Sequence, residues 1–303
     1  MRNMLASAVH TLLRLHSYLI LCCVLFSPLF GQTDAEISVP ITFESQGNTL
    51  KGKFFHAKAS DQALTLILLH GFPGNQEDVL GLGQKLATAG LNVLTFNYSG
   101  THRSEGQFNM PNTLKDIRAA YDYAHRSDAV LRFHIDTTRI VLGGYSYGGG
   151  MALTYAAQHP EIRRVISIAG NDHGEFAREY LRNPHMAQTM DSVFDKLKAP
   201  EGPIHFEGKG VLKKLAANPA PFDLRLSANN LASRDILLIG GWEDEQVTID
   251  HVLLPFYRAL KKAGASKIRF VTYHTDHSFR TVRGELAAQL IQWMQADTVN
   301  TLR

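Results

Sequence analysis

Apolar and polar residues follow two different patterns along the chain. Near the start, segments 37–43 and 50–55 alternate between the two kinds and are separated by Gln46-Gly47-Asn48, which predicts an antiparallel hairpin. Short apolar runs without strict alternation follow, at 64–69, 92–96, 140–143, 164–168, 236–239 and 268–273. Helical stretches occur at 77–89, 113–125, 149–158, 247–263 and 281–295. Apolar strands that alternate with helices predict an α/β fold with a doubly wound, mostly parallel sheet, whose sites form at the carboxyl ends of the strands.

One interval, residues 171–230, departs from this alternation. Its aromatic and methionine side chains recur at helical spacing, for example at Phe176, Tyr180 and Phe194, and prolines interrupt them repeatedly. An insertion at the edge of the sheet that carries sites predicts a cap over the site. These side chains could also pack a small core within the insertion, and both roles can hold together.

The first 31 residues have the composition of a secretory signal peptide. Two arginines and no acidic residue accompany an apolar run at 18–26, and Gly31 is a small residue at the expected cleavage point. An uncleaved anchor is the alternative, but the run is shorter than the roughly 20 residues that a spanning helix needs. We therefore expect a signal peptide at 1–31, a single domain at 32–303, no membrane span after cleavage, and a secreted or periplasmic product.

Composition narrows the classes of function. The chain has 303 residues, 45% hydrophobic and 19% charged, which suits one sizeable domain. Both cysteines, Cys22 and Cys23, lie in the predicted signal peptide, so the mature chain would have neither a disulfide nor a catalytic thiolate. Loss of Arg2 and Arg14 lowers the net charge from +3 to +1, so the charge suggests no polyanionic partner, and we expect no binding of nucleic acid.

Gly144-Tyr145-Ser146-Tyr147-Gly148 joins a predicted strand to a predicted helix. A serine hydroxyl becomes a useful nucleophile when a strained turn brings it within reach of a base, and glycines on either side let strand and helix pass closely. Glycine and serine are common residues, so the pattern alone is weak. Its position, and the partners that follow in the order Ser, acid, His, make Ser146 the candidate nucleophile.

A base and an orienting carboxylate are needed beside the serine. His277 lies between the last predicted strand and the last helix, whereas His274 falls at the strand end. Asp244 follows the strand at 236–239, with Glu243 and Glu245 as alternatives. We therefore expect His277 as base and Asp244 as acid. His274, Asp276 and His277 could also be read as part of a metal site, but the sequence has no second cluster to complete it.

The oxyanion of acyl transfer needs two hydrogen-bond donors. His70-Gly71-Phe72-Pro73-Gly74 follows the strand at 64–69, and the N–H of Phe72 is the expected donor, because Pro73 has none. The second donor would be the N–H of Tyr147, after the nucleophile at a helix start. The segment could also be a simple turn into a helix, and His70 is expected to brace the loop.

Together these motifs resemble the α/β-hydrolase superfamily over nearly the whole mature chain. They are His-Gly-Phe-Pro-Gly, Gly-Tyr-Ser-Tyr-Gly, Gly-Trp-Glu-Asp-Glu-Gln-Val and Asp-His-Ser-Phe. The loop at 98–108 resembles that of bacterial cinnamoyl/feruloyl-type carboxylesterases and of prolyl-oligopeptidase-like hydrolases. Those relatives usually have Arg or Asp at Ser99 and Gly at His102. His102 and Arg103 could line the pocket edge or lie in a solvated loop.

The resemblance implies the α/β-hydrolase fold and a secreted serine esterase that acts on a small-molecule ester through an acyl-enzyme and needs no cofactor. A peptidase or aminoacyl hydrolase is the alternative, because the fold and the triad do not choose the leaving group. A non-catalytic binding protein on the same fold is a third reading.

Overall fold

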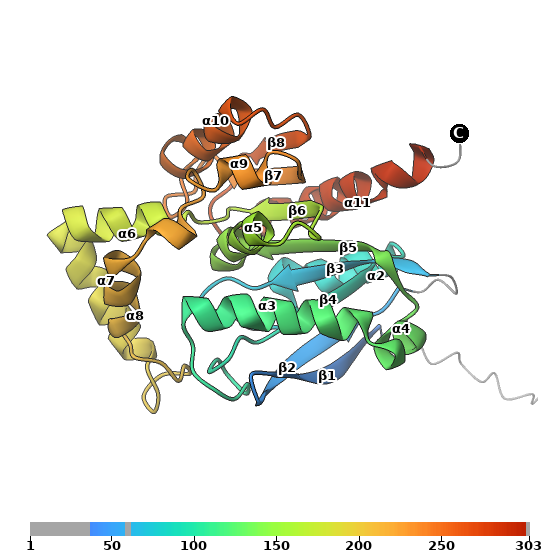
Figure 1. Cartoon of the computed structure of the whole chain (residues 1–303), viewed down its shortest axis with the longest axis horizontal. Coiled ribbons are helices and arrows are strands. Elements are labelled where there is room, and N and C mark those ends of the chain that lie inside the picture. Colours follow the sequence, from blue (N-terminus) through green and yellow to red (C-terminus); the bar gives the residue numbers. More distant parts are fainter. Residues whose placement is uncertain (1–36, 58–61, 301–303) are drawn as a thin grey trace, which may run out of the picture. The chain divides into compact units, whose positions relative to one another are not determined.

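Eight strands form one sheet in the computed structural model, which describes residues 37–57 and 62–300 (Figure 1). The strands are β1 (Ser38–Ser45), β2 (Asn48–Phe55), β3 (Ala63–Leu69), β4 (Asn92–Phe96), β5 (Ile135–Tyr145), β6 (Arg164–Ile168), β7 (Asp235–Gly241) and β8 (Ile268–Tyr273). Their order across the sheet is β1-β2-β4-β3-β5-β6-β7-β8. The predicted signal peptide at 1–31 lies outside the described residues. None of the helices in the described ranges combines the length and the apolar character needed to span a membrane.

The pairing of the strands follows the prediction. β1 and β2 form the antiparallel hairpin, with Gln46 and Gly47 at the turn at φ of 52° and 78°, as a two-residue hairpin turn requires. β2 is also antiparallel to β4, and every further pair is parallel. The prediction of a mostly parallel sheet with an N-terminal antiparallel hairpin is confirmed.

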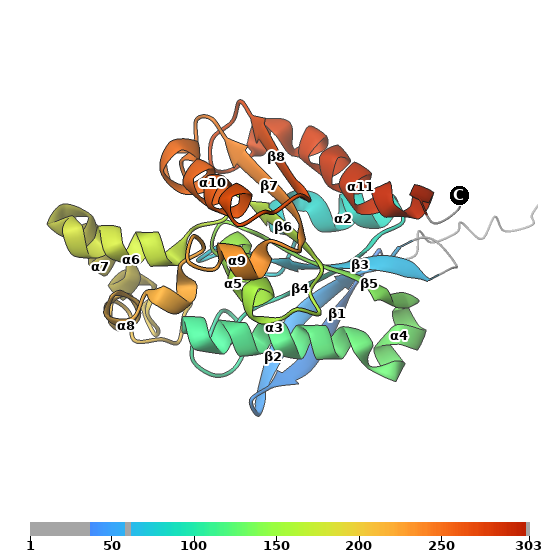
Figure 2. The ribbon, with the colours of Figure 1, turned by 45° about the horizontal axis from the view of Figure 1, so that its top comes forward.

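Helices cover both faces of the sheet (Figure 2). On one face lie α3 (Met110–His125), α4 (Ser127–Phe133), α5 (Tyr147–Gln158), α9 (Ala228–Leu231) and α10 (Leu254–Lys262). On the other lie α2 (Leu82–Thr88) and α11 (Arg283–Asn300). Alternate residues of β3 reach the two cores: Ile67 packs on the first face and Leu66 on the second. Because both faces are covered, β3 is buried throughout, and all of its residues except Thr65 are apolar.

The interval 171–230 forms a group of helices beside the sheet, visible at one side in both views (Figures 1 and 2). It contains α6 (His173–Arg182), α7 (Pro184–Leu197), α8 (Gly210–Ala217) and a 3₁₀ turn at Ala220–Phe222, and its last residues begin α9, which packs on the sheet face. Tyr180, Leu212 and Ala216 form a small apolar core there. We call the interval the cap.

Element ends differ from the prediction where the backbone departs from regular helix. The helix predicted at 77–89 begins at Leu82, after a 3₁₀ turn at Val79–Gly81, because Leu80 and Gly81 have positive φ. The helix predicted at 247–263 begins as a π turn, Ile249–Leu253, and continues as α10. α4 was not predicted from the sequence.

Candidate active site

Ser146 lies at the turn between β5 and α5 in a strained conformation. Its φ and ψ are 54° and −118°, which costs a non-glycine residue about 1–3 kcal/mol. Backbone hydrogen bonds hold the turn: the N–H of Ser146 donates to Ile168 O at 2.8 Å, and Ser146 O accepts from the N–H groups of Gly150 and Asn171. The strain is therefore supported by the neighbouring strand and loop.

The glycines around Ser146 are required by close backbone contacts. A Cβ on Gly144 would lie 2.3 Å from the carbonyl carbon of Gly148, and one on Gly148 would lie 2.6 Å from His70 O. Strand, turn and helix can pass this closely only without side chains at these two positions. These close contacts explain why glycine is found two residues before and two residues after Ser146.

Three side chains from three strand ends form one hydrogen-bonded chain. Nε2 of His277 lies 2.9 Å from Oγ of Ser146, and Nδ1 of His277 lies 2.7 Å from Oδ2 of Asp244. The Asp244 carboxylate accepts from Nδ1–H, so Nε2 is left unprotonated and faces the serine hydroxyl. This is the tautomer that a general base needs.

The structure distinguishes Asp244 from the two neighbouring carboxylates. Asp244 is 3% exposed, and its Oδ1 accepts from the N–H groups of Gln246 and Val247, each at 2.8 Å. Glu243 is exposed and pairs with His274 at 3.1 Å, and Glu245 is exposed. Of the three, Asp244 is the one fixed against His277.

The residues considered as a metal fragment turn to separate partners. His274 pairs with Glu243, and Asp276 accepts from the backbone N–H and the hydroxyl of Ser278 at 3.0 and 2.6 Å. His277 faces Asp244 and Ser146. Their side chains therefore do not converge on one point.

Tyr145, next to the serine, supports the loop of His277. Its hydroxyl donates to the backbone carbonyl of His277 at 2.8 Å. Burial, with the nearby Asp244 charge, raises the pKa of Tyr145 to about 12, so the phenol keeps its proton. Sequence reasoning missed this contact, because nothing in the motif indicates where the tyrosine points.

The loop 70–74 passes directly beside Ser146. A Cβ on Gly71 would lie 3.2 Å from Cβ of Ser146, and Gly74 N–H donates to Gly71 O at 2.8 Å. Phe72, whose N–H is the expected oxyanion donor, lies between these glycines. The N–H of Tyr147, the other expected donor, is at the first turn of α5.

His70 lies beneath this loop and is buried. Its Nδ1–H donates to Gly71 O at 2.7 Å, while its own carbonyl accepts from the hydroxyl of Tyr98 at 2.7 Å. Burial lowers the pKa of His70 to about 4, so the ring is neutral near pH 7. Its contacts are those of a loop brace, as expected from the sequence.

His102 connects the same loop to the cap. Its Nε2–H donates to Gly74 O at 2.8 Å, and its backbone N–H donates to Pro203 O in the cap at 3.1 Å. The φ of His102 is 51°, in the left-handed region that favours glycine, whereas Arg103 is exposed. His102 thus contacts the loop that carries Phe72.

Aromatic rings from the core and the cap meet around Phe72. Its ring stacks on Phe108 of the core and on Phe194 of the cap, each at a centroid distance of 5.0 Å. Phe206, also from the cap, lies 6.2 Å from Phe72. The cap therefore reaches the loop beside Ser146 through aromatic side chains.

Backbone hydrogen bonds also attach the cap to the core. Phe108 N–H donates to His205 O at 2.9 Å, and His205 N–H donates to Gly100 O at 2.7 Å. At the start of α6, His173 is buried, and its Nε2–H donates to Tyr147 O at 3.2 Å. Burial lowers the pKa of His173 to about 4.

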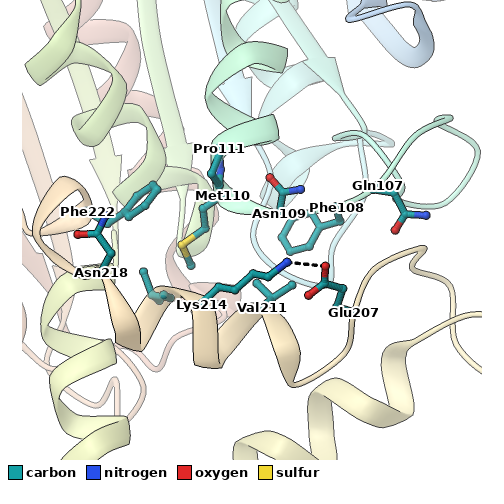
Figure 3. A pocket seen from close by; sticks show the side chains of 11 residues that line it. Gln107, Phe108, Asn109, Met110, Pro111, Glu207, Val211, Lys214, Asn218 and Phe222 are labelled. Carbon is teal, nitrogen blue, oxygen red and sulfur yellow. Dashed lines mark hydrogen bonds and ion pairs between the residues drawn. The ribbon is translucent and has the colours of Figure 1, made fainter.

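A cavity of about 590 Å³ lies where α8 faces the start of α3 (Figure 3). Its walls are mainly apolar and include Met110 from the core and Val211 from α8, and the ion pair Lys214–Glu207, 2.6 Å long, lies on one side. Phe108 lines the cavity and also stacks on Phe72. This ring therefore stands between the cavity and the loop beside Ser146.

Comparison with known proteins is consistent with this architecture. A profile described as the α/β-hydrolase fold matches residues 65–208. Cutinase 2 of Thermobifida cellulosilytica is 26% identical over 119 residues, which are 39% of this chain and 43% of the cutinase. The uncharacterized protein YfhR of Salmonella typhi is 32% identical over 130 residues, 41% of this chain and 42% of that protein. The chain thus spans less than half the length of these curated relatives.

Solved structures are similar over a longer range. The Pyrococcus furiosus esterase Pf2001 has a TM-score of 0.60 at 16% identity, with 86% of this chain and 90% of that chain covered. Est1E from Butyrivibrio proteoclasticus, solved with ferulic acid bound, has a TM-score of 0.62 at 19% identity, with 86% and 99% covered. At such low sequence identities, these similarities concern the fold alone. The profile, the order of the strands and the likeness to these structures together show that the chain has the α/β-hydrolase fold.

Proposed function

We propose that the chain is a serine hydrolase of carboxylesterase type, with Ser146 as nucleophile, His277 as general base and Asp244 as the orienting acid. The observation that carries the proposal is the hydrogen-bonded chain from Ser146 Oγ through His277 to Asp244. Nucleophile, base and orienter in mutual hydrogen-bond contact are what acyl transfer requires.

In the proposed first step, Oγ of Ser146 bonds to the acyl carbon of an ester while its proton passes to Nε2 of His277. The negative charge that develops on the carbonyl oxygen is stabilised by the N–H groups of Phe72 and Tyr147. Asp244 stabilises the imidazolium without taking its proton. When the carbon–oxygen bond to the alcohol breaks, the leaving oxygen takes the proton from His277.

The second step reverses these roles with water. Nε2 of His277 takes a proton from water, whose oxygen attacks the acyl carbon of the Ser146 ester. The same two N–H groups stabilise the second tetrahedral intermediate. Its collapse returns the proton to Oγ of Ser146 and releases the carboxylic acid, so the chain needs no cofactor in this mechanism.

We propose esters with apolar acyl groups, in preference to amides, as the substrates. The rings of Phe72, Phe108 and Phe194 form an apolar wall beside the candidate donor, and buried hydrocarbon contributes about 0.8 kcal/mol per CH₂. Similarity to cutinases and to esterases, one of which was solved with ferulic acid bound, supports the same class. We propose short-to-medium or aromatic acyl groups as the preferred substrates.

The test is kcat/KM over a chain-length and aryl series of esters, beside aminoacyl anilides. The proposal predicts that values rise from acetyl esters toward longer or aromatic acyl groups and then fall. Faster hydrolysis of the anilides than of every ester would support a peptidase instead. If neither class of substrate were hydrolysed and Ser146 did not react with acylating reagents, the protein would instead be a non-catalytic binding protein on this fold.

We also propose that the protein is exported, on the strength of the apolar run at 18–26 and the small residue Gly31. Mass spectrometry of the protein recovered outside the cytoplasm should show a new N-terminus close to Gln32. Recovery of a chain that still carries Cys22 would contradict cleavage.

A further inference from the structure

A second hollow lies at the opposite edge of the sheet, at the amino ends of β5 to β8. Its volume is about 1180 Å³. β6, β7 and β8 pair in register from their first residues, with Arg164 opposite Asp235 and Ile236 opposite Ile268. Neighbouring strands lie about 4.8 Å apart, so side chains at these strand starts form a row across the edge.

Cations dominate this hollow. Its basic lining residues are Arg139, Arg163, Arg164, Arg234, Lys267 and Arg269, and its acidic ones are Glu161 and Asp235. Both carboxylates already have partners: Asp235 pairs with Arg164 at 3.2 Å, and Glu161 accepts from His159 at 3.1 Å. The acidic groups thus leave most of the positive charge uncompensated.

Four of the cations have no carboxylate partner within residues 37–57 and 62–300: Arg163, Arg234, Lys267 and Arg269. Arg163, Lys267 and Arg269 are exposed, and the Nε of Arg234 is buried without a hydrogen-bond partner. Like charges gathered in one concave surface raise its potential and attract multivalent anions.

Helix ends do not account for the row. A cation near a helix C-terminus is stabilising only within the last turn. α5 ends at Gln158, five residues before Arg163, and α10 ends at Lys262, five residues before Lys267. Arg163 and Lys267 therefore lie beyond the reach of these two helix dipoles, and Arg234 follows α9, which has only four residues.

We propose that this hollow binds an acidic polysaccharide, a chain that carries a carboxylate or sulfate on successive sugar units. The row of cations extends over several strands and is longer than a single phosphate ion. The hollow is concave, so a flat lipid surface would not reach its cations. Thr137, Thr138, Ser233 and Ser266 also line the hollow, and hydroxyl side chains are suitable hydrogen-bond partners for sugars.

Nucleic acid fits less well because the aromatic rings of the hollow are already covered. Binding of single strands relies on aromatic faces on which bases stack. The guanidinium of Arg164 lies 4.1 Å from the ring of Trp293, and Tyr121 packs against His125 at 4.4 Å. The site is independent of Ser146, which lies at the carboxyl edge of the same sheet.

The experiment measures the affinity of a fluorescently labelled heparin oligosaccharide by anisotropy, with the full protein. The double variant Arg163→Gln/Lys267→Gln removes two exposed cations of the hollow. Lys196→Gln/Lys213→Gln, two exposed lysines of the cap, removes the same charge elsewhere and is the matched control. Unchanged thermal unfolding and ester turnover in both variants verify the fold.

The proposal predicts that the hollow variant binds at least about tenfold more weakly and that the slope of log affinity against log salt falls by about two, whereas the control stays close to the wild type. If both variants bound the oligosaccharide equally more weakly than the wild type, the proposed site would be wrong. Binding of a single-stranded oligonucleotide of equal charge, or of vesicles with anionic headgroups, as tight as that of the oligosaccharide would overturn its assignment. If inorganic phosphate at equal total charge displaced the oligosaccharide, the hollow would bind anions in general and would not recognise a polysaccharide chain.

Discussion

The candidate triad and the cap differ in how their atoms are held. Hydrogen bonds of 2.7–2.9 Å connect Ser146, His277 and Asp244, and backbone N–H groups fix the carboxylate. In the cap, α7 has no buried residue, Val193 is 42% exposed, and the contact with the loop beside Ser146 is made by the ring of Phe194. Directional hydrogen bonds fix the candidate triad, whereas α7 of the cap contacts the loop beside Ser146 through the packing of aromatic rings.

This difference separates chemistry from specificity. Catalytic groups must be held closely to one geometry, and a small displacement costs a large factor in rate. Phe194 belongs to α7, which has no buried residue, so its ring can adjust to different acyl groups with little cost to the core. We therefore expect changes at the strand ends to lower kcat strongly, and changes in the cap to alter KM and substrate preference.

The largest effect is expected from Ser146→Ala and His277→Ala. Each should lower kcat by about 10⁴-fold or more, because the triad acts as a unit, while the thermal unfolding of the protein stays near that of the wild type. Steady-state kinetics on the best ester, with circular dichroism on the same samples, measure both. Turnover near the wild-type rate in either variant would contradict the assignment.

Asp244→Asn should lower kcat by about 10³- to 10⁴-fold, since an amide favours the wrong tautomer of His277. Glu243→Gln, which changes the neighbouring exposed carboxylate in the same way, is the matched control and should retain activity. If the Glu243 variant were the damaged one, the acid would have to be reassigned.

The sequence predicted the elements that carry the triad because each motif is local. A glycine-flanked serine between strand and helix, and an acid and a histidine after later strands, fix which loops meet at one edge of a parallel sheet. Whether Asp244 or a neighbour turns inward depended on the N–H groups of Gln246 and Val247, whose direction no pattern reveals. The contact of Phe194 with Phe72 joins residues far apart in sequence and was equally hidden.

The basic hollow and helix α4 were also not predicted from the sequence. The net charge of +1 expected for residues 32–303 gave no sign of the cations that the sheet brings together from separate strands. α4 was not predicted, because its short segment Ser127–Phe133 carries Leu131 at 76% exposure and so lacks a clear apolar face.

His173 joins the two regions, because it begins the cap and donates to the carbonyl of Tyr147. Burial lowers its pKa from 6.5 to about 4, so between these pH values the unfolded chain takes up a proton that the folded chain does not. Stability contributed by this group is therefore complete above pH 6.5 and falls as pH is lowered, by about 2 kcal/mol between pH 7 and pH 5.

His173→Gln keeps a donor for Tyr147 and does not titrate. Denaturant unfolding at both pH values should show that the variant loses about 2 kcal/mol less on acidification than the wild type. The comparison is made within each protein, so the cost of the substitution at pH 7 cancels. Equal losses in both proteins would contradict a buried neutral imidazole at this junction.

The smallest effect is expected in the cap. Phe194→Ala removes the ring stacked on Phe72 and should raise KM for aromatic acyl esters about 2- to 10-fold, with kcat little changed. Val193→Ala, at the exposed neighbouring position, is the control. A large loss of kcat in the Phe194 variant would mean that the cap takes part in fixing the catalytic geometry.

The proposed acyl-enzyme on Ser146 is tested most directly by labelling with a fluorophosphonate, followed by peptide mass spectrometry. A serine activated by His277 should be modified stoichiometrically, on the peptide that contains Ser146, and ester hydrolysis should be lost in proportion to the label. Ser146→Ala should take up no label. Modification of another residue, or equal labelling of the Ser146→Ala variant, would contradict the account.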